Sequence, residues 1–590
     1  MRRTGRFFVF IILIVIGIVG IWWHRNKKDN PEEKNEVILH NVYVNTVSGS
    51  VITGVSKGEN QNWKLASVVT GGAINGIADL TLKEGKVTRI VKKPMEVTGK
   101  VLKIENETIT LEEYGQVPLE SNFVVYCIRK DGRVTQGTQK DINIGISDIR
   151  FVVAGDKICG AMIKESKIQN IRVLLKNTEG TSYDMAQIRV TANTEFTVTA
   201  DKQTKKYGAG QMVSFKAKQM KGRAVVSTAG KGKIKICNLK RQQGVPEYRG
   251  ILEIEKYQKA LQVINEVSLE EYLYSVVPSE MPTSYSMEAL KAQAVCARSY
   301  AVRQMKNRRL AHRGAHVDDS VSFQVYNNIR EDERAIQAVN ETKNQVVTQK
   351  GKVASTYFFS TTAGCTSGTK DVWFTKKDTA YLSSALQIVP SQKKQFLSEE
   401  EFITYIKEPP KTLDSSSPWY RWQVEISVEN LRKSLEKSIK NRYESNPSQI
   451  QVKQGDGTYR SQFVETVGEI KNISVIKRGA GGVVKVLEVE GTKATIRIYT
   501  EYNIRAILVG EKEEFIRQDK KKATGLSILP SGFFYLEKKE SSYRFYGGGY
   551  GHGVGMSQNG ANVLATQGKK YVDILTFYFP GTSVQSHESL

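Results

Sequence analysis

A short segment rich in proline carries a carboxyl group that could do acid–base chemistry. It runs from Pro278 to Pro282 and has Glu280 at its centre. The neighbours Val277 and Met281 are apolar, so desolvation would raise the pKa of Glu280 toward neutral pH, as a general acid requires. The spacing alone also fits a solvated turn residue, or a residue that caps the next helix. Glu280 is therefore a candidate acid whose role depends on its surroundings.

Two helices must hold this segment in place, and the sequence predicts both within residues 267–307. Ser268 and Glu271 form a capping-box pair that starts the first helix. Pro278 is expected to end it and Pro282 to prepare the second, because proline lacks an amide donor and restricts its predecessor. The second helix has a face of small residues that permits close backbone approach, made of Ala294, Ala297 and Ala301.

A glycine-rich segment near the carboxyl end is the second unusual stretch. Glycine recurs at every second position from Gly547 to Gly555. In an extended strand this clears one face of side chains, so that a ligand or another backbone can come close, while Tyr550 and His552 lie on the opposite face. Tight internal packing of a glycine strand is the alternative. Ser557 and Gln558 then begin a helix.

Two further segments carry polar groups at close spacing. Residues 360–369 are dense in hydroxyls and glycine, which suits hydrogen bonding to a polyol, although an ordinary turn-rich loop has the same composition. The segment that follows the second helix offers Asp318, Asp319, Gln324 and Tyr326.

Composition narrows the class of partner. The chain has 86 Lys and Arg against 61 Asp and Glu, a net charge of +25, which favours a polyanion. Nucleic acid has only this charge in its favour, because no zinc-finger, RNP-like or basic-zipper pattern occurs, and no nucleic-acid partner is predicted. The five cysteines are scattered without C-x-x-C pairs, which argues against a disulfide framework or a structural zinc site.

The amino terminus predicts a membrane anchor. Phe7 to Trp23 is an uncharged apolar run of about 17 residues, with tryptophans suited to a membrane interface. We expect a cytoplasmic tip at 1–6, a transmembrane signal anchor at 7–23 and a polar linker at 24–34. This gives a single-pass protein of the cell membrane with the bulk of the chain on the extracytoplasmic side. A cleaved signal peptide is the alternative.

The remaining chain predicts an α+β protein. Residues 35–167 consist of short β-branched segments between turn signals, which indicates a β-rich accessory region. Residues 168–590 mix strands and helices around the predicted helix pair at 267–307, which we call the helical elbow. The predicted glycine-rich strand and the carboxyl-terminal helices span 546–583.

Three motifs in order resemble one family. PSEMP at 278–282, EALKAQAVCARSYAV at 288–302 and GYGHGVGMSQNGA at 549–561 are similar to the stage II sporulation protein D family, which includes the amidase-enhancer LytB proteins. The ending ILTFYFPGT at 574–582 is similar as well. The resemblance runs from about 168 to 583. It implies a lytic transglycosylase that acts outside the membrane on peptide-stripped peptidoglycan glycan strands, with a cell-wall amidase or endopeptidase as partner and Glu280 as catalytic acid.

The chain departs from the family's pattern at Ser284–Ser286, which replaces a tryptophan-containing segment, and at a loop. Phe359 to Gly364 replaces a His-Ser-Thr-Ser-Gly-Gly segment, so the histidine is lost. Some relatives are thought to hold zinc near this loop, whereas here Cys365 is the only good ligand in it. We therefore predict no cofactor, with zinc left open.

The implied reaction needs only one acid. Glu280 would protonate the oxygen between MurNAc and GlcNAc and would then deprotonate the C6 hydroxyl of MurNAc, which attacks C1 to give a 1,6-anhydro product. Hydrolysis would need a second carboxylate, for which Asp318, Asp319 and Asp371 are candidates.

A non-enzymatic glycan-binding enhancer of a separate N-acetylmuramoyl-L-alanine amidase is the alternative function. The predicted substrate-binding residues are Ser279, Arg298, Gln324, Tyr326, Ser360, Thr361, Gly364, Gly549, Tyr550, Gly551, His552, Gly553, Ser557 and Gln558.

Overall fold

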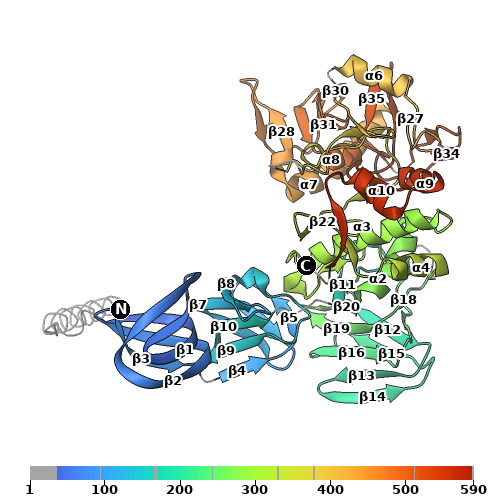
Figure 1. Ribbon diagram of the computed structural model, residues 1–590. Helices are drawn as coiled ribbons and strands as arrows, with labels where there is room; N and C mark the ends of the chain where they lie inside the picture. The colour runs from blue at the N-terminus through green and yellow to red at the C-terminus, as the bar shows by residue number, and fades with distance from the viewer. Residues whose placement is uncertain are drawn as a thin grey trace, which may run out of the picture. The chain divides into compact units, whose positions relative to one another are not determined.

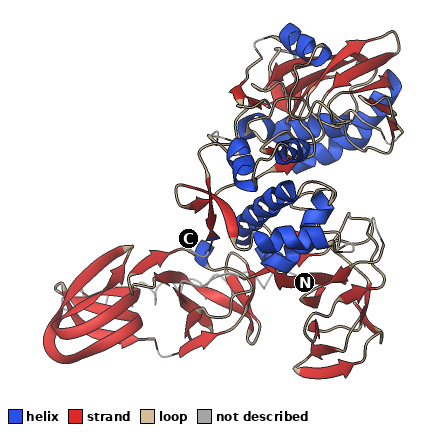
Figure 2. Ribbon diagram, turned by 45° about the vertical axis from the view of Figure 1, so that its right-hand side comes forward, coloured by secondary structure: helices blue, strands red, loops and turns tan. Residues whose placement is uncertain are grey.

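The chain divides into two compact units, Met1–Ile168 and Gln169–Leu590 (Figure 1). This computed structural model describes residues 36–93, 95–164, 169–241, 244–328, 331–375, 379–396, 398–510 and 512–587. The described chain is a strand-rich mixture of helices and strands, so the predicted α+β class is confirmed. Strands dominate the first unit, and the longer helices belong to the second (Figure 2).

The predicted location as a single-pass protein of the cell membrane is corrected here. Among the helices within the described ranges, none is both long and apolar enough to cross a bilayer. The predicted anchor at 7–23, with the tip at 1–6 and the linker at 24–34, lies outside the described residues. The membrane location is therefore not retained.

The described part of the first unit forms two sheets. A long antiparallel hairpin turns at Lys57 and Gly58, which both have positive φ, and a third strand joins its second arm. Apolar residues on one side of the hairpin form a core that includes Val44 and Ile52. The strands of this sheet are β1 (Glu36–Ser56), β2 (Glu59–Lys83) and β3 (Lys86–Lys92). The second sheet has the order β4 (Met95–Thr98), β9 (Arg150–Ala154), β10 (Lys157–Lys164), β7 (Gly115–Ile128), β6 (Thr108–Leu111) and β5 (Val101–Ile104), with β8 (Val134–Gly137) paired to β7.

The second unit begins with a sheet that feeds directly into the helical elbow. Strand β20 (Ala260–Ser268) is buried from Leu261 to Val267 and continues without a loop into helix α2 (Leu269–Glu280). Its neighbours are β19 (Ile251–Tyr257) and β11 (Asn170–Leu174). The other strands of this sheet are β14 (Gln203–Tyr207), β13 (Phe196–Ala200), β16 (Arg223–Thr228) and β21 (Val317–Asp318). A smaller sheet contains β15 (Val213–Lys216), β12 (Gln187–Ala192), β17 (Ile234–Ile236) and β18 (Glu247–Tyr248).

Helix α2 ends two residues later than the sequence suggested. Ser268 caps its start by accepting a hydrogen bond from the amide of Glu271. Pro278 lies inside the last turn, because a proline removes one helical hydrogen bond without preventing the next amide from closing the turn. The turn is closed by the amide of Met281, which donates to the carbonyl of Val277 at 3.0 Å. Glu280 is thus the last helical residue.

Helix α3 (Met287–Met305) is central in the second unit. Its small residues Ala294, Ala297 and Ala301 are fully buried, which lets neighbouring elements approach closely. It packs against α2, α4 (Glu333–Glu341), α9 (Gln558–Thr566), α10 (Tyr571–Tyr578) and β22 (Gln345–Gln349). In Figure 1 the carboxyl-terminal helices α9 and α10 lie beside α3.

The carboxyl terminus returns to this region through two strand pairings. Strand β38 (Ser583–Ser586) pairs with β22, which also pairs with β23 (Lys352–Val353). Strand β37 (Met556–Ser557) pairs in parallel with β24 (Phe358–Phe359). These pairings place the start of α9 beside the loop that follows β24, far away in sequence.

Two five-stranded sheets and their helices form the remaining core. Their inward apolar residues, with those of α7 (Val428–Ser445) and α8 (Glu501–Ile507), make one buried cluster. One sheet has the order β34 (Lys522–Ala523), β33 (Phe515–Arg517), β27 (Trp422–Ser427), β36 (Ser542–Gly547) and β35 (Phe534–Lys538). The other has the order β29 (Tyr459–Ser461), β28 (Ile450–Lys453), β32 (Thr495–Tyr499), β31 (Val484–Gly491) and β30 (Ile470–Arg478). Smaller elements nearby are α5 (Thr369–Val372), α6 (Glu399–Lys407), β25 (Ala385–Leu386) and β26 (Gln392–Lys393).

Candidate functional site

The carboxyl group of Glu280 is half-buried, and few hydrogen-bond donors stabilise its ionised form. Its Oε1 accepts one hydrogen bond, from the backbone amide of Val325 at 2.7 Å. Burial raises the pKa of Glu280 to about 7, and this single hydrogen bond only partly opposes the effect. The carboxyl group is therefore poised to give and to take a proton near neutral pH.

The start of α9 holds the backbone of this residue. Gln558 donates from Nε2 to the carbonyl oxygen of Glu280 at 2.9 Å and lies 3.3 Å from Oε1 of Gln293 on α3. The side chain of Gln558 is 6 % exposed. It is therefore part of the framework that fixes the end of α2, and not a free donor for a ligand.

The hydroxyl-rich loop meets the same helix. Asn559 donates from Nδ2 to the carbonyl of Ser360 at 3.0 Å and to Oγ1 of Thr361 at 2.8 Å, and it accepts from the hydroxyl of Tyr285 at 2.7 Å. Tyr285 lies five residues after Glu280, between helices α2 and α3. One asparagine therefore joins the elbow to the Ser360 loop, although Asn559 was not among the predicted site residues.

A buried carboxylate behind this loop was also missed. Asp414 is 1 % exposed and accepts hydrogen bonds from the hydroxyls of Thr362 and Ser557, each at 2.6 Å. Burial raises the pKa of Asp414 to about 6. It lies in a serine- and proline-rich stretch with no periodic pattern, and nothing in the local sequence marks it as buried.

The glycine-rich segment is a loop and not the extended strand predicted. Strand β36 ends at Gly547, and the alternate glycines that follow have positive φ: Gly549 +83°, Gly551 +113°, Gly553 +77° and Gly555 +83°. Protein fills the face that was predicted to be open. A Cβ atom on Gly551 would lie 2.7 Å from Cβ of Phe359, and one on Gly553 would lie 2.7 Å from the ring of Phe533.

The same correction applies to Gly549 and Gly364. A Cβ atom on Gly549 would approach the carbonyl oxygen of Thr361 to 2.8 Å, and one on Gly364 would approach the hydroxyl of Tyr405 to 2.1 Å. These glycines allow the two loops to pack together. They leave no room for a ligand at their Cα atoms, so the internal-packing alternative holds.

Tyr550 and His552 keep some exposure beside these glycines. The backbone of Tyr550 pairs with that of Thr361 in both directions, and its ring packs on Trp419. The ring of His552 contacts Phe359 and Trp373, and its Nδ1 accepts from the amide of Val554 at 3.0 Å. Burial, with a contribution from Arg505, lowers the pKa of His552 to about 3, so the ring is neutral.

Arg298 is a structural residue and not a contact for substrate. Its guanidinium is completely buried and binds the carboxylate of Glu270 through two bonds, of 2.9 and 2.7 Å. It also donates to the carbonyls of Val339 and Gln345, each at 3.1 Å. Arg298 therefore ties α3 to α2, α4 and β22.

Three other predicted contacts are also engaged internally. Gln324 and Tyr326 are each 1 % exposed, and Tyr326 donates to Oδ1 of Asn265 at 2.7 Å. Ser279 donates back to the carbonyl of Ser275 at 2.6 Å within α2. Burial removes Gln324 and Tyr326 from contact with a ligand, whereas Ser279 keeps partial exposure next to Glu280.

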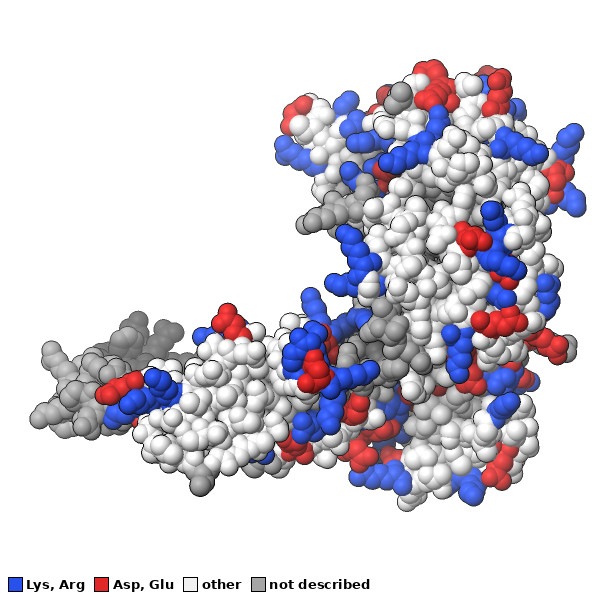
Figure 3. Space-filling model, in the orientation of Figure 1, with Lys and Arg blue, Asp and Glu red and all other residues white. Residues whose placement is uncertain are grey.

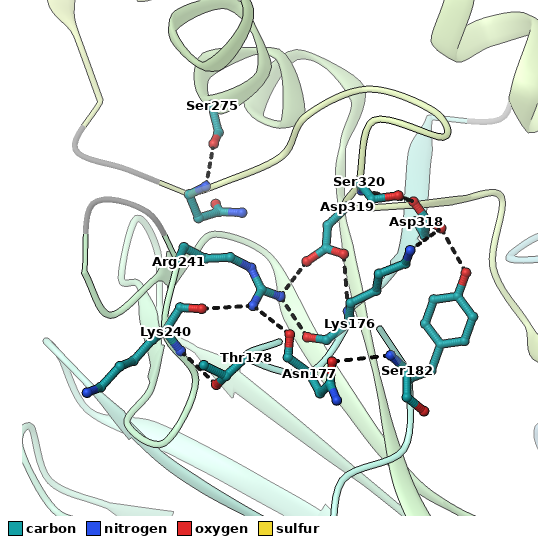
Figure 4. A network of polar contacts seen from close by, with 12 residues as sticks. Lys176, Asn177, Thr178, Ser182, Lys240, Arg241, Ser275, Asp318, Asp319 and Ser320 are labelled. Atoms are coloured by element: carbon teal, nitrogen blue, oxygen red, sulfur yellow. Dashed lines mark hydrogen bonds and ion pairs between the residues drawn. The ribbon is translucent and has the colours of Figure 1, made fainter. Parts of the chain in front are cut away.

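The three aspartates considered as a second acid all accept hydrogen bonds from protein donors. Asp319 accepts from Arg241 at 2.5 Å and from the amide of Lys176 at 3.1 Å (Figure 4). Asp318 accepts from Tyr183 and Ser320, each at 2.7 Å. Asp371 accepts from Nζ of Lys485 at 2.7 Å and from the amide of Ala480 at 3.0 Å. Each stabilises its own part of the fold.

The residues of the Ser360 loop do not fit a zinc ion. Cys365 is fully buried, its thiol lies 3.5 Å from the hydroxyl of Tyr405, and burial raises the pKa of the thiol to about 11. The position that resembles the family's histidine is Phe359. Within the described ranges, no group of three His, Cys, Asp or Glu side chains is arranged to hold a metal ion.

Charged side chains of both signs occur on one face of the molecule. On the face that Figure 3 shows, Lys and Arg side chains are interspersed with Asp and Glu. The net charge of +25 therefore does not by itself mark the site.

Comparisons with known proteins match two parts of the chain to family models. Residues 257–349, which include α2, Glu280 and α3, match the family model of the stage II sporulation protein, SpoIID. Residues 367–555 match a second model, a domain of unknown function (DUF8618). The resemblance to the SpoIID and amidase-enhancer family is therefore confirmed.

Individual relatives agree with this assignment. An amidase enhancer of Bacillus subtilis (strain 168) is 29 % identical over 53 % of this chain, and the match covers 40 % of that protein. Stage II sporulation protein D is 26 % identical in the same organism and 27 % identical in Bacillus amyloliquefaciens; each match covers 57 % of this chain and 80 % of the relative. The chain thus spans less than half the length of the amidase enhancer.

Proposed function

We propose that this protein acts on the cell wall as a lytic transglycosylase that cleaves the MurNAc–GlcNAc bonds of peptide-stripped glycan strands, with Glu280 as the single general acid and base. The observation that carries the proposal is a half-buried carboxyl group with a pKa of about 7 inside the matched SpoIID region. The names of the relatives favour a role in sporulation.

The acid step follows from the protonation state of Glu280. Because the pKa of Glu280 is raised toward neutral pH, its carboxyl group can carry a proton there, and this proton can pass from Oε to the glycosidic oxygen as the C1–O bond breaks. The same carboxylate, now ionised, can remove the proton of the MurNAc C6 hydroxyl while that oxygen attacks C1. The 1,6-anhydro bond forms, and Glu280 is again protonated.

The hydrogen bonds that protein donors make to the three candidate aspartates support this single-acid route over hydrolysis. A hydrolase places a second carboxylate about 5 to 9.5 Å from the acid, with free oxygens for a nucleophile or a water. Asp318, Asp319 and Asp371 each have their oxygens bound by protein donors. The substrate's own C6 hydroxyl then takes the place of the second group.

Product analysis on purified, peptide-free glycan strands tests the proposal. Mass spectrometry that finds 1,6-anhydro ends supports transglycosylation. Reducing ends would replace it with hydrolysis, and no product from a folded, glycan-binding protein would overturn the enzymatic proposal.

The second candidate is a glycan-binding enhancer of a separate cell-wall amidase, which the match to an amidase enhancer favours. An enhancer would raise the amidase rate equally with wild-type protein and with Glu280→Gln, whereas an enzyme that prepares or consumes the glycan would not. A cell-wall amidase or endopeptidase is the expected partner in both cases.

A further inference from the structure

A groove of about 560 Å³ lies on the five-stranded sheet β34-β33-β27-β36-β35, inside the region that matches a domain of unknown function. The sheet has two different faces. Its inner face buries Trp422, Phe515 and Phe545 in the apolar cluster of the second unit. Its outer face carries a direct cross-strand row of Ile516, Gln423, Tyr546 and Tyr535, and all four residues line the groove.

Two aromatic rings form the floor of this groove. Tyr535 and Tyr546 stack with a centroid distance of 5.0 Å and an interplanar angle of 17°. Tyr546 is partly exposed, whereas Tyr535 is 3 % exposed and is approached by Lys407. A flat ring accessible on one side is suited to the C–H face of a sugar, because such a face offers a broad apolar surface between hydroxyl groups.

Positive charge surrounds these rings. Lys407, Arg421, Arg517 and Lys520 line the groove, against one acid, Glu537. Lys407 lies 4.0 Å from Glu537, and Arg517 pairs with Asp519 at 2.9 Å. The groove therefore has a surplus of cations.

Arg421 and Lys520 provide this surplus. Arg421 donates to the carbonyls of Ile406, Ala363 and Tyr405, at 3.0, 3.0 and 3.2 Å, and pairs with no carboxylate in the described part of the chain. Lys520 is exposed, and across the described residues its ammonium group has no ion pair. In addition, the buried Nε of Arg517 has no hydrogen-bond partner among the described atoms. Arg421 is partly buried without a carboxylate partner, which is costly, so it attracts an anion. The exposed Lys520 adds to this attraction.

We propose that this groove binds an anionic saccharide, whose acidic group lies among Arg421, Arg517 and Lys520 and whose sugar face lies on Tyr546. The acidic group expected on the proposed substrate is the lactyl carboxylate that peptide removal exposes on MurNAc, so the identity of the saccharide rests on the proposed function. Binding of a carboxylated glycan at the groove does not depend on cleavage.

The groove adjoins the loops of the candidate site. Arg421 binds the carbonyl of Ala363, next to Gly364, and Trp422 donates from Nε1 to the carbonyl of Gly549 at 3.1 Å. Arg421 in the groove is thus bonded to the hydroxyl-rich loop, and the next residue, Trp422 on the inner face of the sheet, is bonded to the glycine loop.

Binding measurements in the Glu280→Gln background separate this proposal from catalysis. The probes are a peptide-free strand of alternating GlcNAc and MurNAc and a neutral chitin oligosaccharide of the same length. Lys520→Glu should weaken binding of the carboxylated strand about three- to tenfold and leave chitin binding unchanged, because it reverses one partly exposed charge. Tyr546→Ala should weaken binding of both probes, and Tyr546→Phe should retain it.

Lys453→Glu is the matched control, since Lys453 is exposed on β28 in the other sheet of the same core. It should bind both probes like the parent protein. Unchanged binding in both Lys520→Glu and Tyr546→Ala would overturn the proposal, and equal loss of both probes in Lys520→Glu would overturn the role of the carboxylate. A protein that cleaves no glycan but shows the expected Lys520 effect would refute the proposed enzyme and retain the groove.

Discussion

The side chain of Gln558 donates to the backbone carbonyl of Glu280 at 2.9 Å, although the two residues are 278 positions apart. The bond joins the first turn of α9 to the last residue of α2. The next residue, Asn559, holds Tyr285 and the Ser360 loop. The carboxyl group of Glu280 is therefore placed by contacts that form only when the carboxyl terminus has folded back onto α3.

Glu280→Gln should abolish glycan cleavage while glycan binding is nearly unchanged. The amide has almost the same shape but can neither deliver nor accept a proton, and such assistance is worth about 10² to 10⁴ in rate. The loss should appear in kcat and not in affinity, because the interaction is made at the transition state. Asp318→Asn, Asp319→Asn and Asp371→Asn are the comparison set. Near-native cleavage by Glu280→Gln, together with loss of cleavage in one of the aspartate variants, would show that the catalytic acid is another residue.

The pKa of Glu280 predicts a pH-dependent difference in stability between the wild type and Glu280→Gln. The folded pKa is about 7 and the ordinary value is 4.5, so the unfolded state releases its proton first as pH rises. The wild type should therefore lose stability relative to the variant between about pH 4.5 and 7, by about 1 to 3 kcal/mol, with a constant difference above that range. Urea unfolding of both proteins at pH 4, 6 and 8 measures it. Parallel curves at all three values would mean that the carboxyl group has an ordinary pKa.

Local sequence features predicted the helix pair and the position of Glu280. The burial of Asp414 and the conformation of the glycine-rich loop depend on contacts between residues far apart in sequence. The cap at Ser268, the prolines and the apolar neighbours of Glu280 are local, so the helix pair and its terminal acid could be predicted. Asp414 could not, because only folding buries it between Thr362 and Ser557. The glycine spacing was misinterpreted for a physical reason: glycine permits an extended strand and repeated positive φ equally, and only the rings of Phe359 and Phe533 show which one forms.

Arg298→Met should lower stability strongly and leave the affinity for glycan unchanged in the folded fraction. The substitution removes the guanidinium bonds to Glu270 and to the carbonyls of Val339 and Gln345, and breaking a buried ion pair from one side costs about 3 to 5 kcal/mol. Arg303→Met on the same helix is the control, since its side chain makes one exposed bond to the carbonyl of Val353 and should cost less than about 1 kcal/mol. A folded Arg298→Met protein of normal stability with a large loss of glycan affinity would restore the substrate contact predicted from the sequence.

Gly551→Ala and Gly457→Ala should separate backbone strain from packing. Both glycines have positive φ, +113° and +80°, so each alanine carries a conformational cost of about 1 to 2 kcal/mol. A Cβ atom at Gly457 meets nothing within 4 Å, whereas at Gly551 it would lie 2.7 Å from Cβ of Phe359. Gly551→Ala should therefore lose about 1 to 3 kcal/mol more than Gly457→Ala in chemical unfolding. Equal losses would mean that the space beside Gly551 is open, as the ligand-cleft interpretation required.

Ser557→Ala should damage both stability and cleavage, because Ser557 has two structural roles. Its hydroxyl caps α9 through the amide of Gly560 at 3.2 Å and donates to Asp414 at 2.6 Å. Losing the cap costs about 1 kcal/mol, and a buried carboxylate with one donor fewer adds about 1 to 2 kcal/mol. Ser427→Ala is the matched control: it removes the cap of α7, at the amide of Asn430, without a buried acid and should cost only about 1 kcal/mol. Since α9 also carries Gln558, the Ser557 variant should lower kcat through Glu280, whereas the Ser427 variant should cleave normally. Equal stability losses and equal cleavage rates in the two variants would show that Asp414 and the start of α9 do not support the site.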